Sequence, residues 1–356
     1  MDQLYYQAVD LLKSLIAIPS ISREEKAAAD FLEQHLIKEG LKPHRYGNNI
    51  FVLSDDFDPM RPTLLLNSHI DTVRPNDGWT RNPFTPEEEE DRIYGLGSND
   101  AGASLVSLLA AFIYMNSIPR SYNMIYLASC EEEVSGKNGI ESVLNHLPPV
   151  TVAIVGEPTG MNPAVAEKGL MVLDGEIEGV AGHAARNEGV NAIYKAMDVI
   201  ATLKDMKFPK ESPTLGPVKI SVTQIEAGTQ HNVVPALCKI VVDVRTTDAY
   251  SNAQTLDLIR AAVPECRLTP RSTRLNPSSI SVEHPIVRRL TMMGAVPFGS
   301  PTLSDQALMP WCSVKLGPGD SARSHSADEY IISSEIRDAI AKYVIIMSNL
   351  CISHEI

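Results

Sequence analysis

The sequence predicts an α/β protein in which a mixed, largely parallel sheet with flanking helices is interrupted by an inserted α+β domain. In the first 165 residues, short apolar runs of strand length alternate with helical runs, which is typical of an α/β domain. From about residue 166 the pattern changes to hairpin-like strands, and near residue 277 it changes back. At 356 residues, two domains are expected. We assign residues 1–165 and 277–356 to the first domain and residues 166–276 to the second.

The individual elements follow from the spacing of apolar residues and from turn residues. Two amphipathic helices are expected first, and the second of them ends at Gly40. Residues 74–94 are predicted to form a long, proline-rich connection, and the acidic run Glu87–Glu90 within it a solvated loop or strand edge. The predicted helices are 3–17, 24–40, 104–113, 189–203, 253–263, 285–293 and 333–349, and the main strands are 50–53, 64–66, 122–129, 151–155, 171–180, 217–225, 238–245, 267–274 and 311–316.

Composition excludes several classes of protein. The net charge of −13, with no basic run, argues against a nucleic-acid partner. No stretch approaches 18 uninterrupted apolar residues, and the first residues lack a signal-peptide pattern. The five cysteines are scattered and contain no CxxC pair, which indicates a reducing cytoplasm and no zinc–thiolate site. We therefore expect a cytoplasmic protein with neither a membrane nor a nucleic-acid partner.

The most informative stretch is the buried strand that ends at His69, with Asp71 two positions later. Residues i and i+2 of an extended segment point the same way, so Asp71 is predicted to accept a hydrogen bond from the second nitrogen of the His69 ring. Such a bond orients a metal-ligating imidazole. Taken alone, the pair could also be an ordinary surface turn.

Acidic residues or a histidine also follow the carboxyl ends of other predicted strands. The glycine-rich segment before Asp100 partly matches a dinucleotide-binding motif, but a carboxylate at its sixth position would face the phosphates. A metal ligand at the start of a helix is the alternative reading of Asp100. The residues collected in this way are His69, Asp100, Glu132, Glu133, Glu157 and His325.

Two histidines and several carboxylates, without thiolates, suit Zn²⁺ or a similar divalent ion. The set is large enough for two ions sharing one carboxylate, with one acid left over as general base. Glu132 and Glu133 are adjacent, so in an extended stretch they would point apart. One could then bind metal while the other faces the substrate.

These motifs resemble the dinuclear zinc amidohydrolases that include acetylornithine deacetylase, succinyl-diaminopimelate desuccinylase, aminoacylase and glutamate carboxypeptidase. The resemblance covers nearly the whole chain and is strongest to acetylornithine deacetylase. It implies a zinc-exopeptidase-like first domain and a second domain that acts as a lid and dimerisation domain. The matching segments are His69-x-Asp71-x-Val73, Gly95-x-Gly97-x-x-Asp100, Glu132-Glu133, Gly156-Glu157-Pro158-Thr159, Gly317-Pro318-Gly319 to His325, and Asp328-Glu329-Tyr330.

By resemblance, Asp100 bridges two Zn²⁺ ions per subunit, for which Co²⁺ or Mn²⁺ could substitute. His69 and Glu157 complete one metal site, and Glu133 and His325 complete the other. Glu132 is implied as the general base, and Asp71, the partner of the His69 ring, is counted with it among the catalytic residues. The resemblance also implies a cis peptide bond between Asp100 and Ala101. The chain departs from the family at Leu96, where arginine is frequent, and at Ala101–Ala103, where lysine is frequent; neither departure affects a ligand.

The resemblance also assigns residues of the inserted domain, and Gly319 of the first domain. His183 would stabilise the oxyanion in the site of a partner subunit, which implies a homodimer formed through the lid domain. Asn232, Arg245 and Gly319 would bind substrate, since an arginine can hold a carboxylate through two hydrogen bonds. An ion pair between Arg245 and Asp243 is the alternative for that arginine.

The predicted reaction is hydrolysis of the amide bond of an N-acyl amino acid. The family relatives that have glutamate at position 157 are deacylases, which favours N-acetyl- or N-succinyl-ornithine or -citrulline and a place in arginine biosynthesis. The alternatives are a dipeptidase or carboxypeptidase, a succinyl-diaminopimelate desuccinylase, and a metal-binding relative without activity. A serine hydrolase is not indicated, because the sequence has no Gly-x-Ser-x-Gly elbow.

Overall fold

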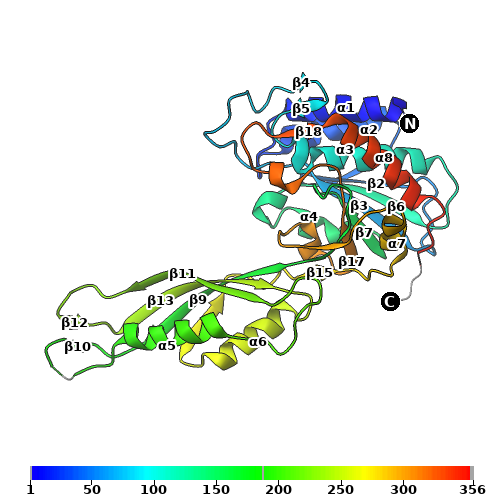
Figure 1. Cartoon of the computed structure of the whole chain (residues 1–356). Coiled ribbons are helices and arrows are strands. Elements are labelled where there is room, and N and C mark those ends of the chain that lie inside the picture. Colours follow the sequence, from blue (N-terminus) through cyan, green and yellow to red (C-terminus); the bar gives the residue numbers. More distant parts are fainter. Residues whose placement is uncertain (1, 187, 353–356) are drawn as a thin grey trace. The chain divides into compact units, whose positions relative to one another are not determined.

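The computed structural model describes residues 2–186 and 188–352, which form two compact units (Figure 1). Unit 1 contains residues 2–165, 279–298 and 304–352, and unit 2 contains residues 166–186, 188–278 and 299–303. The predicted α/β class with a largely parallel sheet is confirmed. In the part of the chain that the structure describes, no helix has both the length and the apolar character needed to cross a bilayer.

The largest sheet, most of whose residues belong to unit 1, has parallel strands in its middle and antiparallel strands towards its edges. Its order is β1-β2-β6-β3-β7-β17-β8-β15, and β16 pairs with β8. Strand β3 runs parallel to both β6 and β7, and β17 runs parallel to β7. The strands are β1 (Pro43–Tyr46), β2 (Asn49–Leu53), β3 (Thr63–His69), β6 (Asn123–Ser129), β7 (Val152–Val155), β8 (Ala164–Glu167), β15 (Ser278–Ser279), β16 (Phe298–Ser300) and β17 (Cys312–Lys315).

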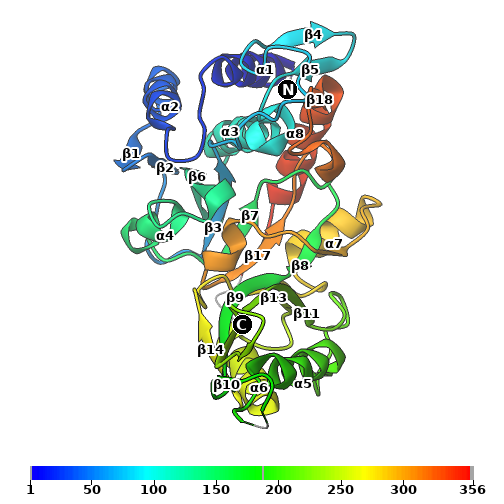
Figure 2. The ribbon, with the colours of Figure 1, turned by 90° about the vertical axis from the view of Figure 1, so that its left-hand side faces the viewer.

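Apolar clusters cover both faces of this sheet, which explains why its central strands read as unbroken apolar runs. On β3, Leu64 and Leu66 join a core with α1, α3 and α8, while Leu65 joins a second cluster with α4. Figure 2 shows α1, α3 and α8 gathered on one side. The helices of this unit are α1 (Asp2–Ile16), α2 (Lys26–Lys38), α3 (Ala103–Asn116), α4 (Ile140–Val143), α7 (Pro285–Met292) and α8 (Ser333–Met347).

A small antiparallel sheet lies where the sequence predicted only a connection. Its order is β18-β5-β4, formed by β4 (Glu87–Glu89), β5 (Arg92–Tyr94) and β18 (Tyr330–Ile332). Three-residue strands are too short to show a two-residue period, and β18 pairs with β5 across more than two hundred residues of sequence. The acidic run is thus a strand edge, one of the two alternatives expected.

Unit 2 is a four-stranded antiparallel sheet with two helices on one face (Figure 1). Its strand order is β11-β13-β9-β14. Burial alternates along β9 because only one face is covered by the helices. The elements are β9 (Gly169–Glu178), β10 (Gly182–His183), α5 (Ala192–Asp205), β11 (Lys219–Ala227), β12 (Val233–Val234), β13 (Leu237–Thr246), α6 (Asn252–Ala262) and β14 (Cys266–Pro270).

Candidate metal centre

The parallel strands of unit 1 bring most of the predicted ligands to one edge of the sheet. Strand β3 ends at His69, β6 leads to Glu132 and Glu133, and β7 leads to Glu157. Parallel strands have their carboxyl ends on the same edge, where sites of open α/β sheets lie. Two sets of three residues there have ligand atoms within 4.8 Å of one another: His69 with Glu132 and Glu157, and His69 with Asp100 and Glu133.

His69 is buried and its ring orientation is set by the backbone. Its Nδ1 lies 2.9 Å from the carbonyl oxygen of Asp71 and 3.6 Å from the Asp71 carboxylate. A carbonyl oxygen can only accept, so Nδ1 donates its proton and Nε2 keeps a free lone pair. The predicted partner was the Asp71 carboxylate; the shorter contact is instead to the carbonyl of the same residue. Nε2 faces Asp100 at 3.3 Å and Glu157 at 3.7 Å.

Asp100 lies between the two histidines. Its Oδ1 is 3.3 Å from Nε2 of His69, and its Oδ2 is 3.5 Å from Nε2 of His325. His325 also approaches Glu133, with 3.0 Å between Nε2 and Oε2. The cis peptide bond predicted between Asp100 and Ala101 is confirmed. One carboxylate oxygen facing each imidazole is the arrangement that a bridging ligand requires.

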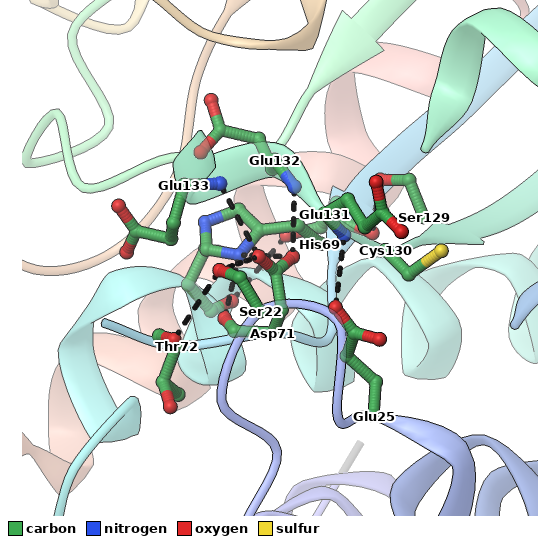
Figure 3. A network of polar contacts seen from close by, with 12 residues as sticks. Ser22, Glu25, His69, Asp71, Thr72, Ser129, Cys130, Glu131, Glu132 and Glu133 are labelled. Atoms are coloured by element: carbon green, nitrogen blue, oxygen red, sulfur yellow. Dashed lines mark hydrogen bonds and ion pairs between the residues drawn. The ribbon is translucent and has the colours of Figure 1, made fainter. Parts of the chain in front are cut away.

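The Glu132–Glu133 segment differs from its predicted conformation. These residues form a turn of 3₁₀-helix, Glu132–Val134, rather than an extended stretch, so their side chains are separated by about a third of a turn. The Asp71 carboxylate accepts the backbone N–H groups of Glu132 at 3.0 Å and Glu133 at 3.2 Å, and the Ser22 hydroxyl at 2.6 Å (Figure 3). Asp71 therefore holds this turn, a role that its spacing from His69 did not indicate.

A neighbouring contact holds the residue before this turn. The buried carboxylate of Glu25 accepts the backbone N–H of Glu131 at 3.2 Å (Figure 3). Glu131 itself binds the side chain of Asn138 at 2.8 Å, through its Oε1. The segment after α1 thus supports the acidic turn indirectly: Ser22 binds Asp71, which holds the turn, and Glu25 binds the residue before it.

The electrostatics of the cluster favour a bound cation. Burial raises the pKa of Glu157 to about 8, and nearby carboxylates add to this effect. Burial likewise raises the pKa of Glu132 well above its usual range. Several buried acids close together are unfavourable unless positive charge offsets them. Divalent cations supply that charge, and the imidazole and carboxylate donors are those that Zn²⁺ accepts, so the residues present fit a metal centre.

The predicted site residues of unit 2 each form local hydrogen bonds within that unit. His183 is exposed, and its Nδ1 accepts the N–H of Ala185 at 3.1 Å, which leaves the proton of a neutral ring on Nε2. The carbonyl oxygen of Asn232 accepts the N–H of Ala184 at 3.0 Å. Arg245 forms two hydrogen bonds to Asp243, at 2.9 and 3.2 Å. The ion pair considered as the alternative is therefore present, and substrate binding by Arg245 stays a prediction.

Three buried polar residues near the ligands, Glu329, Asn99 and Asp305, were not among the predicted site residues. Glu329 binds the backbone of the loop that carries Asp100, and Asn99 binds the segment that leads to His325. Asp305 accepts the Ser129 hydroxyl at 2.5 Å, and burial raises its pKa to about 6. Glu329 stood inside a recognised motif, but nothing in the sequence distinguished Asn99 or Asp305.

Residues 65–349 match Peptidase family M20/M25/M40. An acetylornithine deacetylase of Klebsiella pneumoniae is 28% identical over 362 aligned positions, which cover 91% of this chain and 92% of the relative. A succinyl-diaminopimelate desuccinylase of Erythrobacter litoralis is 25% identical over 271 positions, which cover 69% of this chain and 71% of the relative.

The fold also matches solved structures. The Bacillus subtilis YXEP protein, described as a dinuclear metal-binding peptidase of the M20 family, superposes with a TM-score of 0.74. That match covers 98% of this chain and all of the neighbour, at 14% sequence identity. At this identity the likeness concerns the fold.

Proposed function

Because the chain belongs to Peptidase family M20/M25/M40, we propose that it is a dinuclear metal-dependent amidohydrolase that removes the acyl group from an N-acyl amino acid. The observation that carries this proposal is Asp100, whose two carboxylate oxygens face two different imidazoles. The description of the Bacillus subtilis neighbour as dinuclear and metal-binding supports it. His69, Asp100, Glu133, Glu157 and His325 are the proposed ligands.

When bound, two ions such as Zn²⁺ would lower the pKa of a water molecule and polarise the acyl carbonyl. The chain's own residues would move the proton and hold the geometry. Glu132 would accept the proton from the attacking water and return it to the departing amine. Its place beside His69 and Glu157, with its ligand atom within 4.8 Å of theirs, puts the carboxylate next to the proposed ions and their water. Asp71 would keep Glu132 in place through its backbone N–H.

The residues of unit 2 would act on the substrate. We propose that His183 donates a hydrogen bond from Nε2 to the developing oxyanion in a partner subunit's site. Arg245 would exchange part of its ion pair with Asp243 for a substrate carboxylate, and Asn232 would add a contact to the substrate. Gly319, which belongs to unit 1, is also proposed to contact the substrate. The tautomer set by Ala185 supports the donor role of His183.

The proposed substrates are N-acetyl- or N-succinyl-ornithine or -citrulline, in a cytoplasmic pathway of arginine synthesis. The relative named acetylornithine deacetylase aligns over nearly its whole length and supports this choice. The test is amine release by the zinc-loaded protein from these four compounds, succinyl-diaminopimelate and several dipeptides. A preference for one acyl-ornithine or acyl-citrulline is expected. A preference for dipeptides would replace the deacylase proposal with a peptidase.

We further propose that unit 2 mediates a homodimer. Strand β11 lies at one end of the strand order of the four-stranded sheet, and an edge strand offers unpaired backbone groups to another chain. The adjoining helix α5 exposes Tyr194 and Met197, at 69% and 62%. Two large apolar side chains three residues apart lie on one face of a helix, and such a patch is typical of an interface.

Replacing Tyr194 and Met197 together by glutamate is expected to convert the dimer to a monomer, because charges would enter the apolar patch. Light scattering coupled to gel filtration would measure the mass. Thr202→Glu adds one negative charge at an exposed polar position of α5, away from the apolar pair, and should leave the dimer intact. A wild-type chain that is monomeric at micromolar concentration would contradict the proposal.

A further inference from the structure

A buried glutamate outside the proposed ligand set binds the loop that carries Asp100. Glu329 is 2% exposed. Its Oε1 accepts the backbone N–H groups of Asn99 at 2.8 Å and Asp100 at 2.9 Å, and its Oε2 accepts that of Gly97 at 3.1 Å. One carboxylate thus receives three main-chain hydrogen bonds, one of them from the proposed bridging ligand itself.

These N–H groups need an acceptor, since they lie at the start of a helical segment. The first N–H groups of a helix have no intrahelical partner, and here the turn Ser98–Gly102 is further interrupted by the extended backbone of Asp100. Leaving such groups buried without a partner is costly. A carboxylate satisfies them with charge-assisted bonds and thereby defines where the backbone of Asp100 lies.

Glu329 is itself fixed by secondary structure. It immediately precedes β18, whose Tyr330 pairs with Tyr94 of β5. Its carbonyl oxygen accepts the N–H of Gly95 at 3.0 Å, which extends the same pairing. Strand β18 continues directly into α8, which packs in the main core of unit 1. The carboxylate is therefore attached to a rigid part of the fold.

The side chain of Asn99 connects the Asp100 loop to the segment that precedes His325. It accepts the N–H of Asp320 at 3.1 Å and donates to the carbonyl of Asp320 at 3.1 Å and to the hydroxyl of Ser324 at 3.3 Å. A Cβ at Gly319 would lie 2.3 Å from Oδ1 of Asn99, so position 319 must be glycine for this contact to form. Ser324 directly precedes His325.

We infer that Glu329 and Asn99 are positioning residues that hold Asp100 and His325 at the separation a shared metal centre requires. Glu329 fixes the backbone of Asp100. Asn99, the residue before Asp100, binds the segment that precedes His325 and so connects the two ligands. The inference rests on the proposed function, because it concerns the same ions. Neither residue would touch an ion or the substrate. Residues that orient metal ligands typically contribute about 10–100-fold to metal affinity.

The experiment is a zinc titration of the full-length, metal-free protein by calorimetry, with Co²⁺ absorption spectra as a second readout of ligand geometry. The variants are Glu329→Gln, which places an NH₂ group against N–H donors, and Asn99→Ala, which leaves every bond of Glu329 possible. Asp328→Asn is the matched control, because the Asp328 carboxylate binds Thr80 and Arg81 and not the Asp100 loop.

We expect Glu329→Gln and Asn99→Ala to weaken the binding of at least one ion by about tenfold or more and to change the Co²⁺ spectrum. The control should retain wild-type values. Folded variants with wild-type affinity and spectrum would overturn the inference while leaving the proposed function standing. If circular dichroism shows that Glu329→Gln does not fold, the zinc affinity and Co²⁺ spectrum of Asn99→Ala alone test the inference. A wild-type chain that binds no zinc would overturn both the proposed function and this inference.

Discussion

Replacing Glu132 by glutamine is expected to lower kcat by about 10²–10⁴-fold with little change in metal content. Glutamine keeps the size of the side chain but cannot accept a proton from water at neutral pH. Proton transfer by a positioned carboxylate is the contribution that the substitution removes. The measurements are steady-state kinetics on the preferred acyl amino acid and metal analysis of the purified variant.

The same variant also tests whether Glu132 is a ligand. Its carboxylate lies within 4.8 Å of the ligand atoms of His69 and Glu157, so geometry alone permits that role. A loss of one ion in Glu132→Gln would reassign Glu132 to the ligand set, and activity near the wild-type rate would remove it from the mechanism. Glu39→Gln is the matched control, because it makes the same change at an exposed glutamate at the end of α2.

Replacing Asp100 by alanine is expected to abolish the dinuclear centre. The carboxylate faces both His69 and His325, so its removal takes a ligand from both ions. The ions are expected to supply several kcal/mol of transition-state stabilisation, which corresponds to a loss of at least about a thousandfold in rate. Equilibrium dialysis with zinc, followed by metal analysis, would measure the stoichiometry.

The control for this experiment is Asp91→Asn, because Asp91 is exposed and its Oδ1 accepts the N–H of Ser334. Removing metal from the wild type with a chelator should reproduce the loss of activity, and added zinc should restore it there but not in Asp100→Ala. An Asp100→Ala protein that still binds two ions would show that Asp100 does not bridge them. The contacts of Asp100 with the two imidazoles would then reflect hydrogen bonding and not a shared ion.

The sequence by itself determined the α/β class, the main helices and strands and the identity of the clustered residues. Apolar runs of strand length predicted β3, β6, β7 and β17, because strands covered on both faces cannot alternate with polar residues. Parallel strands place their carboxyl ends on one edge, so residues following different strands had to meet there. This reasoning needs only the order and type of residues along the chain.

Only the tertiary structure decided how the residues of the site are held. The Asp71 carboxylate lies 3.6 Å from the ring of His69, the residue predicted to be its partner, but it also holds the Glu132–Glu133 turn, which the sequence did not indicate. The sequence also predicted an extended conformation for that turn, which forms a 3₁₀-helix. The contacts of Glu329 with the Asp100 loop join residues separated by 229 positions or more. Local periodicity carries no information about which distant backbone groups a buried carboxylate will satisfy, because that depends on how the elements pack.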